Sequence, residues 1–417
     1  MPLHFLVALL VLSTSAAAAA AAAPPAEEPR LPACLTSAGV AVDWWLALKH
    51  PGGDDFSYTD ARSGSGWAPA RPGLGATSGS PLAATLGPLF APPAQAGLAW
   101  AAWNDEPPLP PPGNGTAAAA VSPSSPPWFA HAKGVLAVDP SPAPARGGGG
   151  GGGGGGSGLW LLHSAPAFPA LAPGVPYAGL APPQRIFGQT FLCVSLDRRG
   201  AAAAVAALAA GFRPRAYASA GGSPGGAADA AFPGFAALAG TGPPPQPVPA
   251  GLHRTDLATA GGVPLALFTS AGGAHTPAAL WDEGVARGLS PAPAALAVAS
   301  WRRGPGRALP PACNGGGGRP PSPAVLNVLA VRPPGAGRPA WSGEDDHGKW
   351  GAVLLGGEGG GGNASAASCV GDANREASQA VRGGAAVCLG GVGVLAGAVA
   401  AVDACVMRGL GKGAAVA

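Results

Sequence analysis

Short apolar runs bounded by glycine, proline and other turn residues recur along this chain of 417 residues. Runs of this kind are typical of buried β-strands. Seven stretches carry the pattern: Val42–Leu48, Gly134–Val138, Leu159–Leu162, Phe191–Leu196, Val263–Phe268, Ala294–Trp301 and Val325–Val331. We expect each of them to form a strand.

Two other stretches have the length and the end signals of helices. Ala201–Ala210 is followed by Gly211, a typical C-terminal stop, and Pro277–Leu289 is preceded by Thr276, a typical N-cap. Strands and helices therefore occur on both sides of the Gly-, Pro- and Ala-rich stretch 216–249. This order predicts an α/β (α+β) architecture in two lobes joined by a linker or loop.

The C-terminal stretch Ala385–Val406 is apolar enough to raise the question of a membrane span. It contains four glycines and Asp403, and few positive charges flank it. A buried or amphipathic terminal helix, anchored by Cys388 and Cys405, fits this composition better. We therefore expect no membrane anchor.

Glycine and proline make up 70 and 50 of the residues, which is typical of low-complexity sequence. They concentrate in loops, above all in the ten consecutive glycines Gly147–Gly156. This run separates two predicted strands, so we expect it at the tip of a hairpin, where insertions cost little. The formal charge is +3 and only 11% of residues are charged. The chain thus has no basic tail for electrostatic binding of nucleic acid.

The N-terminal 23 residues resemble a secretory signal peptide, because the apolar run Leu3–Leu12 is too short to span a bilayer and an alanine-rich stretch follows it. Secretion would place the six cysteines in an oxidising compartment, where an even number favours structural disulfides. Spacing alone allows fifteen ways of pairing them. The tripeptides that begin at Asn114 and Asn363 are glycosylation sequons consistent with this route.

Candidate chemistry lies in two His-x-Lys motifs, His131-Ala132-Lys133 and His347-Gly348-Lys349. With seven histidines and four lysines in the chain, about 0.07 such spacings are expected by chance. Residues i and i+2 of an extended segment point to one side, so each motif presents an imidazole and an ammonium group together. Lysine neutralises phosphate oxygens, and histidine can attack phosphorus or move protons. Two facing pairs therefore predict a site that cleaves phosphodiesters with no metal and no other cofactor.

The sequence around these motifs resembles the deoxyribonuclease II family of acid endonucleases. The similar blocks follow one another in the family's order over nearly the whole mature chain: Val42–Trp45, Trp103–Pro108, His131–Asp139, Leu159–Pro166, Phe187–Ser195, Leu326–Val328, Glu344–Trp350, Cys369–Arg375 and Arg382–Gly384. Ala167 departs from the pattern, because the family usually has asparagine there.

The resemblance implies a phospholipase D-like fold with duplicated lobes, in which mixed sheets flanked by helices form a pseudo-dimer around one shared active site. The expected organisation is a signal peptide over 1–23, a first lobe over 24–215, the linker or loop over 216–249, and a second lobe over 250–417. A clamp-like homodimer and a lysosomal, vacuolar or extracellular location are also implied.

The implied activity is metal-independent hydrolysis of DNA at acid pH, which leaves 3′-phosphate and 5′-hydroxyl ends through a phosphohistidine. His131 and His347 would share the nucleophile and general-acid roles, with His131 favoured as nucleophile, while Lys133 and Lys349 hold the phosphate. His163 and Asn374 match a family histidine and a Gly-x-x-Asn-like element, and both are candidates for substrate binding. The implied disulfides are Cys34–Cys193, Cys313–Cys405 and Cys369–Cys388.

Two other functions stay open on the residues alone. The chain could be a secreted binding or wall-associated protein that kept the fold and lost the activity. It could also be a phospholipase D-like phosphodiesterase with another substrate, since the two motifs by themselves do not specify DNA.

Overall fold

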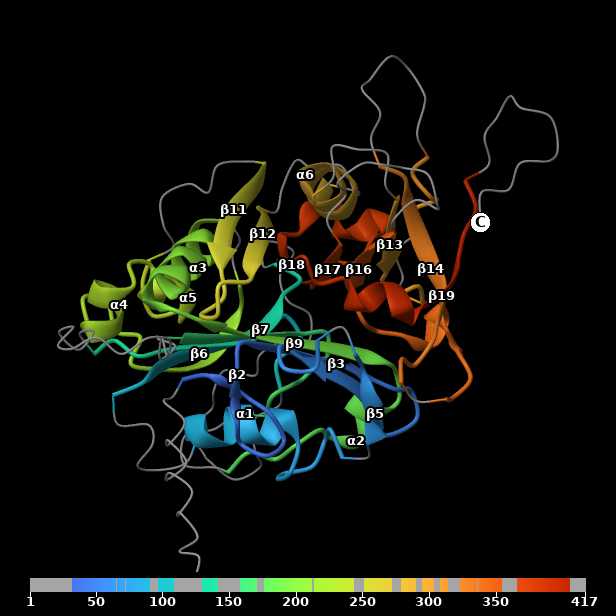
Figure 1. The fold of residues 1–417 in the computed structure, drawn as a ribbon. Coiled ribbons are helices and arrows are strands. Elements are labelled where there is room, and N and C mark those ends of the chain that lie inside the picture. Colours follow the sequence, from blue (N-terminus) through green and yellow to red (C-terminus); the bar gives the residue numbers. More distant parts are fainter. Residues whose placement is uncertain are drawn as a thin grey trace, which may run out of the picture.

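Two stacked β-sheets form the body of the protein in a computed structural model (Figure 1). The structure describes residues 32–64, 66–71, 73–90, 97–108, 130–141, 158–170, 176–211, 214–243, 251–271, 279–289, 295–303, 308–313, 323–335, 337–354 and 366–405. The signal peptide 1–23, the glycine run and both sequons lie outside the described residues. The fold is of the α+β kind, with mixed sheets and few helices.

The first sheet has eight strands in the order β10-β6-β7-β8-β9-β3-β4-β5, and all neighbouring strands are antiparallel. Its strands are β3 (Trp44–Lys49), β4 (Phe56–Asp60), β5 (Ala68–Arg71), β6 (Ala99–Asn104), β7 (Lys133–Val138), β8 (Gly158–His163), β9 (Gln189–Leu196) and β10 (Ala216–Ala220). As expected, β7 and β8 pair on either side of the glycine run.

The second sheet follows the order β11-β12-β18-β17-β16-β13-β14-β15, with β19 paired to β14. Its strands are β11 (Leu252–Ala258), β12 (Pro264–Ser270), β13 (Ala295–Ala299), β14 (Val325–Val331), β15 (Trp341–Ser342), β16 (Trp350–Leu354), β17 (Ala367–Gly371), β18 (Gly384–Gly390) and β19 (Val399–Val402). Among these pairings, only β13 and β14 run parallel.

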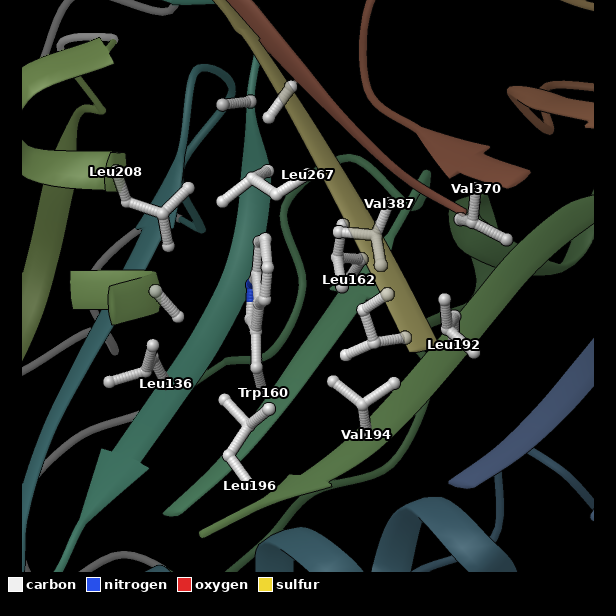
Figure 2. Packing of buried hydrophobic residues seen from close by; sticks show 14 of the residues in the cluster. Leu136, Trp160, Leu162, Leu192, Val194, Leu196, Leu208, Leu267, Val370 and Val387 are labelled. Carbon is white, nitrogen blue, oxygen red and sulfur yellow. The ribbon is translucent and has the colours of Figure 1, made fainter. Parts of the chain in front are cut away.

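The two sheets pack face to face across a shared core. Trp160 and Leu162 from β8 meet Leu267 from β12 and Val387 from β18 in this layer (Figure 2). Second and third buried clusters cover the outer faces of the first and second sheets. Because central strands are buried on both faces, they appear in the sequence as continuous apolar runs, which is why those runs predicted them.

Helices cover the outer faces and one edge of this sandwich. The helices are α1 (Pro81–Phe90), α2 (Pro182–Arg185), α3 (Arg198–Gly211), α4 (Ala227–Ala231), α5 (Phe235–Leu238) and α6 (Ala286–Leu289), with the π-helix η1 (Ala279–Val285) and the 3-10 turns η2 (Gly343–Asp345), η3 (Ala377–Val381) and η4 (Val394–Ala398). The predicted helix 201–210 is confirmed as α3, which begins earlier because Asp197 accepts a hydrogen bond from the backbone N–H of Gly200. The predicted helix 277–289 is present as η1 followed by α6.

Two expectations for the chain were wrong. Ala385–Val406 forms no helix in its described part, but β18, η4 and β19. β18 is inserted between β12 and β17, and this tertiary pairing overrides the helix propensity of alanine. The stretch 216–249, expected to be a linker or loop, contains β10, α4 and α5, and β10 extends the first sheet beside β6.

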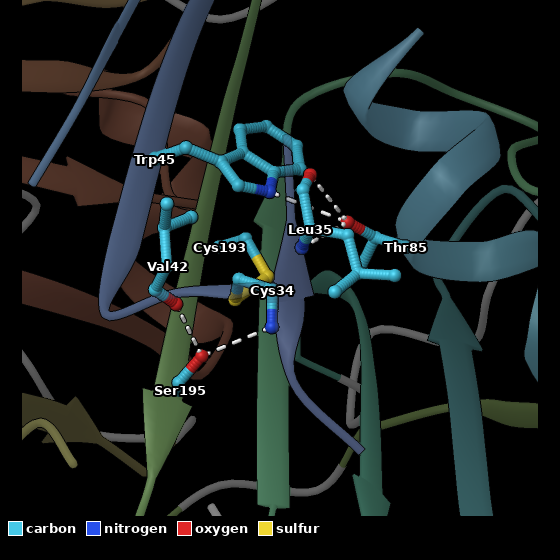
Figure 3. The surroundings of a disulfide bond; sticks show 7 residues. All are labelled: Cys34, Leu35, Val42, Trp45, Thr85, Cys193 and Ser195. Atoms are coloured by element: carbon cyan, nitrogen blue, oxygen red, sulfur yellow. Dashed lines mark hydrogen bonds between the residues drawn. A yellow bond between two sulfur atoms is a disulfide. The ribbon is translucent and has the colours of Figure 1, made fainter. Parts of the chain in front are cut away.

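All three disulfides implied by the resemblance are present: Cys34–Cys193, Cys313–Cys405 and Cys369–Cys388. The first ties the short strand β1 (Cys34–Leu35), which pairs with β2 (Ala41–Val42), to β9. Beside it, the Ser195 hydroxyl accepts from the Cys34 backbone N–H at 2.9 Å and donates to the Val42 carbonyl at 2.7 Å (Figure 3). Such disulfides are typical of secreted or lysosomal proteins. No helix in the described part of the chain is long and apolar enough to cross a membrane.

Candidate functional site

The two His-x-Lys motifs occupy equivalent places, one at the start of β7 and one directly before β16. His131, Lys133 and Lys349 are buried, while His347 is half-buried. Burial lowers the pKa of His347 most, and the charges of Lys349 and Lys133 lower it further. Burial and the charge of Lys133 also lower the pKa of Lys349, whose Nζ atom lies 3.3 Å from Nδ1 of His347. The structure therefore brings the four predicted residues into one site where the two sheets meet.

Each histidine is held by backbone groups from the opposite half of the chain. The Nδ1 atom of His131 lies 2.6 Å from the carbonyl oxygen of Asp372, and its backbone N–H donates to the Gly383 carbonyl at 2.9 Å. The Nδ1 atom of His347 lies 2.9 Å from the carbonyl oxygen of Ser164. Its backbone N–H donates to the Gly188 carbonyl at 2.8 Å.

These contacts fix the tautomer of both rings. A carbonyl oxygen can only accept a hydrogen bond, so Nδ1 carries the proton in each ring. The lone pair of the neutral imidazole then lies on Nε2. Both histidines thus present a nucleophilic or basic nitrogen on the side away from the carbonyl that holds them.

The two carbonyls come from equivalent residues, because Ser164 follows β8 and Asp372 follows β17 directly. The Ser164 hydroxyl accepts from the Thr190 backbone N–H at 3.0 Å, and the Ser164 N–H donates to the Thr190 carbonyl at 3.1 Å. Asp372 repeats this pair of bonds with Ala385, at 2.7 and 3.1 Å. The side chains of Ser164 and Asp372 thus extend the β8–β9 and β17–β18 pairings by one residue. Each residue is thereby held so that its carbonyl contacts the histidine of the other half.

Asp105 is the main carboxylate of the site, and sequence reasoning missed it. Its carboxylate accepts from Lys133, pairs with Arg382 at 3.0 Å and lies 3.8 Å from the Nε2 atom of His131. Burial opposes its charge, but His131 when protonated, Lys133 and Arg382 hold its pKa well below the usual range. The preceding residue, Asn104, pairs with Lys133 across β6 and β7, so only this strand register could have revealed the contact.

Burial is the main cause of the pKa shifts of the other ionisable groups in the site. Burial lowers the pKa of both histidines well below the usual value and lowers the pKa of Lys349 to about 7. Burial also raises the pKa of Asp372 to about 8, so its carboxyl is neutral at acid pH. Below pH 7 the site therefore holds several positive charges against few ionised carboxylates, which favours binding of an anion.

Asp105, Glu106 and His131 are the described residues that could hold a metal ion, since their ligand atoms lie within 4.8 Å of one another. Lys133 and Arg382 already place two positive charges against Asp105. These charges oppose the binding of a further cation.

The two candidate substrate-binding residues lie close to the His-x-Lys motifs. His163 is completely buried between Phe168 and Phe191, with ring centroids 5.1 and 6.0 Å away, and burial lowers its pKa to about 3. Asn374 is also buried, and its side-chain oxygen accepts from the Trp301 backbone N–H at 3.2 Å. The contacts described for His163 and Asn374 are thus with other residues of the protein.

Ala167, where the family usually has asparagine, has a backbone φ of 51°. Asparagine adopts this left-handed region more readily than other non-glycine residues.

Two imidazoles that are held by backbone carbonyls and lie next to buried lysines can serve in a phosphodiester hydrolase. The deoxyribonuclease II family model matches residues 33–395. The protein of Burkholderia thailandensis named "Putative deoxyribonuclease-2" is 29% identical over 356 residues, which cover 83% of this chain and 85% of that protein. Deoxyribonuclease-2-alpha of Mus musculus is 28% identical over 373 residues, which cover 85% of this chain and 88% of the mouse protein.

The chain therefore belongs to the deoxyribonuclease II family, and it is a deoxyribonuclease II-like endodeoxyribonuclease.

Proposed function

We propose that the protein hydrolyses DNA at acid pH without a metal ion, through a phosphohistidine, and leaves 3′-phosphate and 5′-hydroxyl ends. The observation that carries the proposal is the pair of backbone carbonyls that hold Nδ1 of His131 and of His347. They leave two Nε2 atoms for the reaction, one for attack and one for proton transfer.

In the first step, Nε2 of His131 attacks the phosphorus, and the bond to the leaving O5′ breaks as His347 donates a proton to that oxygen. The attacking ring becomes cationic, and the Asp372 carbonyl and the Asp105 carboxylate stabilise this charge. Lys133 and Lys349 bind the phosphate oxygens. The products of this step are a free fragment with a 5′-hydroxyl end and a phosphohistidine whose phosphorus stays joined to the 3′-oxygen of the other fragment.

In the second step, neutral His347 removes a proton from water, whose oxygen attacks the phosphorus while the bond to Nε2 of His131 breaks. This releases the 3′-phosphate and restores both rings. Half-buried His347 suits this role, because the water must enter from the solvent side of the site. Buried His131, paired on its other side with the protein, suits the covalent role.

An acid optimum agrees with the charges of the site. Lys349 is protonated below its pKa of about 7, and the neutral Asp372 carboxyl adds no negative charge there. A bound phosphodiester anion raises the pKa of the nearby histidines, which allows one of them to be protonated in the complex. Two close imidazoles titrate as a coupled pair.

A duplicated, phospholipase D-like fold is the architecture that we propose. The strands around each motif follow the same order in the two sheets. β7, which holds the end of the first motif, lies in the order β6-β7-β8-β9-β3, and β16, which follows the second motif, lies in the order β13-β16-β17-β18-β12. The equivalent places of Ser164 and Asp372 support the same relation. We further propose that the protein works in an acidic compartment of the secretory route, in agreement with its three disulfides.

Nicking of supercoiled plasmid at mildly acid pH in excess chelator tests the activity. The expected result is nicking that persists in chelator and leaves ends that a kinase can label at the 5′-hydroxyl without prior phosphatase treatment. A strict requirement for Mg²⁺ would contradict the mechanism. Cleavage of phosphatidylcholine but not of DNA would instead support a phosphodiesterase with another substrate, and DNA binding without any cleavage would support an inactive binding protein.

A further inference from the structure

A half-exposed aromatic pair lies directly against the site, next to His347. The ring of Trp301, which follows β13, makes a T-shaped contact with His347 at 5.0 Å between centroids. The ring of Phe187, which precedes β9, contacts Trp301 at 4.7 Å. Both side chains are half-buried, and the neighbouring Ile186 is 57% exposed. We call Phe187 and Trp301 the aromatic shelf.

The packing of the fold does not account for this shelf. Neither ring belongs to the buried clusters between or outside the two sheets. The backbone of Trp301 is nevertheless held in place, because its N–H donates to the buried side chain of Asn374. Two flat apolar faces are thus fixed beside a catalytic histidine while part of their surface stays in contact with water.

One arginine side chain lies beside the shelf. The Arg303 guanidinium lies 5.9 Å from the centre of the Phe187 ring and pairs with Asp345 at 2.9 Å. Proteins bind single nucleic-acid bases on aromatic faces that lie close to cationic side chains, since every base presents a π-face.

We propose that the aromatic shelf binds the base of the nucleotide on the leaving-group side of the scissile phosphate. The inference rests on the proposed function, in which His347 donates its proton to the leaving O5′. The sugar that carries O5′ also carries a base, and a ring 5.0 Å from His347 is within reach of that base. Because stacking accepts any base, the shelf holds the leaving nucleotide without selecting a sequence.

The test uses a short single-stranded oligonucleotide in which one phosphodiester is cleavable and all other linkages are methylphosphonates. One substrate keeps all bases, a second lacks the base on the leaving side, and a third lacks the base on the opposite side. For the wild type, we expect loss of the leaving-side base to raise KM about tenfold and loss of the opposite base to have a much smaller effect.

Trp301→Leu removes the π-face, Trp301→Phe keeps an aromatic ring, and Trp67→Leu is the control. Trp67 is also half-buried, but its indole N–H donates to the Val394 carbonyl. Trp301→Leu should raise KM about tenfold on the intact substrate, with little change in kcat and no further rise when the leaving-side base is absent. Trp301→Phe should stay within about threefold of the wild type, and Trp67→Leu should keep the wild-type preference between the substrates. Thermal melting verifies that each variant is folded.

Equal KM of the wild type for intact and leaving-side abasic substrates would overturn the inference, while cleavage itself would leave the proposed function standing. Effects of Trp301→Leu and base removal that simply multiply would also overturn it, because two groups that bind each other cannot act independently. Failure of the wild type to cleave any of the three substrates at acid pH would refute the proposed function, and the inference with it.

Discussion

The two halves of the site have the same backbone framework but different electrostatic surroundings. His131 and His347 are held by equivalent carbonyls, yet only His131 faces a carboxylate, Asp105, at 3.8 Å. His347 instead has Lys349 at 3.3 Å and the ring of Trp301 at 5.0 Å, and it is more exposed. The comparison teaches that shared topology fixes where the reactive atoms lie, while the surrounding charge and solvent access determine what each does.

Replacement of the histidines gives the largest effect and separates their roles. His131→Ala and His347→Ala should each lower kcat by at least about 10³-fold, because each removes an acid–base or nucleophilic group. Single turnovers quenched in alkaline detergent, in which a phosphohistidine is stable, use DNA labelled in the fragment that keeps the 3′-phosphate. They should trap labelled protein in His347→Ala on a substrate with a good leaving group, but never in His131→Ala. Labelled protein in the His131 variant alone would reverse the two roles.

Neutralising Asp105 tests whether the carboxylate is what distinguishes the first half. Asp105→Asn leaves buried Lys133 without its closest carboxylate and removes a partner of half-buried Arg382, and breaking a buried pair costs about 3–5 kcal/mol in stability. We expect kcat to fall roughly 10²-fold at a temperature where the variant is folded. Glu106→Gln is the matched control, since the Glu106 side chain is 49% exposed and comes no closer to Lys133 than 3.9 Å. A loss as large in the control would contradict the special role of Asp105.

The two carbonyl-positioning residues differ in chemistry, and their variants sharpen the comparison. Ser164→Ala removes the acceptor for Thr190 and should lower kcat about tenfold through misplacement of His347. Asp372→Asn keeps an acceptor for Ala385 and should stay within about threefold of the wild type at acid pH, where Asp372 is already neutral. An Asp372→Asn variant as impaired as Asp372→Ala at acid pH would show that the carboxyl acts in some other way.

The pH dependence is the smallest expected effect. The folded-state pKa of Lys349 is lowered to about 7, so its charge is present below pH 7 and is lost as the pH rises through that value. kcat/KM should therefore fall on the alkaline side near pH 7. The arginine in Lys349→Arg keeps its charge throughout this pH range, so the fall in kcat/KM should move to higher pH, even if the rate at acid pH is a few-fold lower.

Lys133→Arg is the matched control for this measurement, because Lys133 already pairs with Asp105. An unchanged alkaline limb in Lys349→Arg would mean that a different group causes the loss of activity.

The sequence predicted the parts of the fold that depend on local pattern. Strands buried on both faces, such as β9, appeared as apolar runs, and the alanine-rich α3 ended at Gly211. The terminal helix was wrong because the pairing of β18 with β12 and β17, together with the Cys369–Cys388 disulfide, depends on residues far away in the sequence. Long-range pairing of this kind outweighs local propensity.

The same distinction applies to the site. The histidines and lysines of the two motifs could be proposed from spacing, since side chains of these types can carry the proposed chemistry. Ser164 and Asp372 could not, because each acts on its histidine through a backbone carbonyl, which every residue has. The contact of Asp105 depends on the register between β6 and β7, and the aromatic shelf joins segments more than a hundred residues apart.

The exchange of carbonyls between the two halves also sets the moment in synthesis at which the site can first work. The first half, through β9, is made before any part of the second motif leaves the ribosome. His131 then has neither the Asp372 nor the Gly383 carbonyl to hold it. A growing chain therefore carries half of a DNA-cutting site with an unrestrained imidazole, and the site is completed only once the residues between β17 and β18 have been made and have folded against β7.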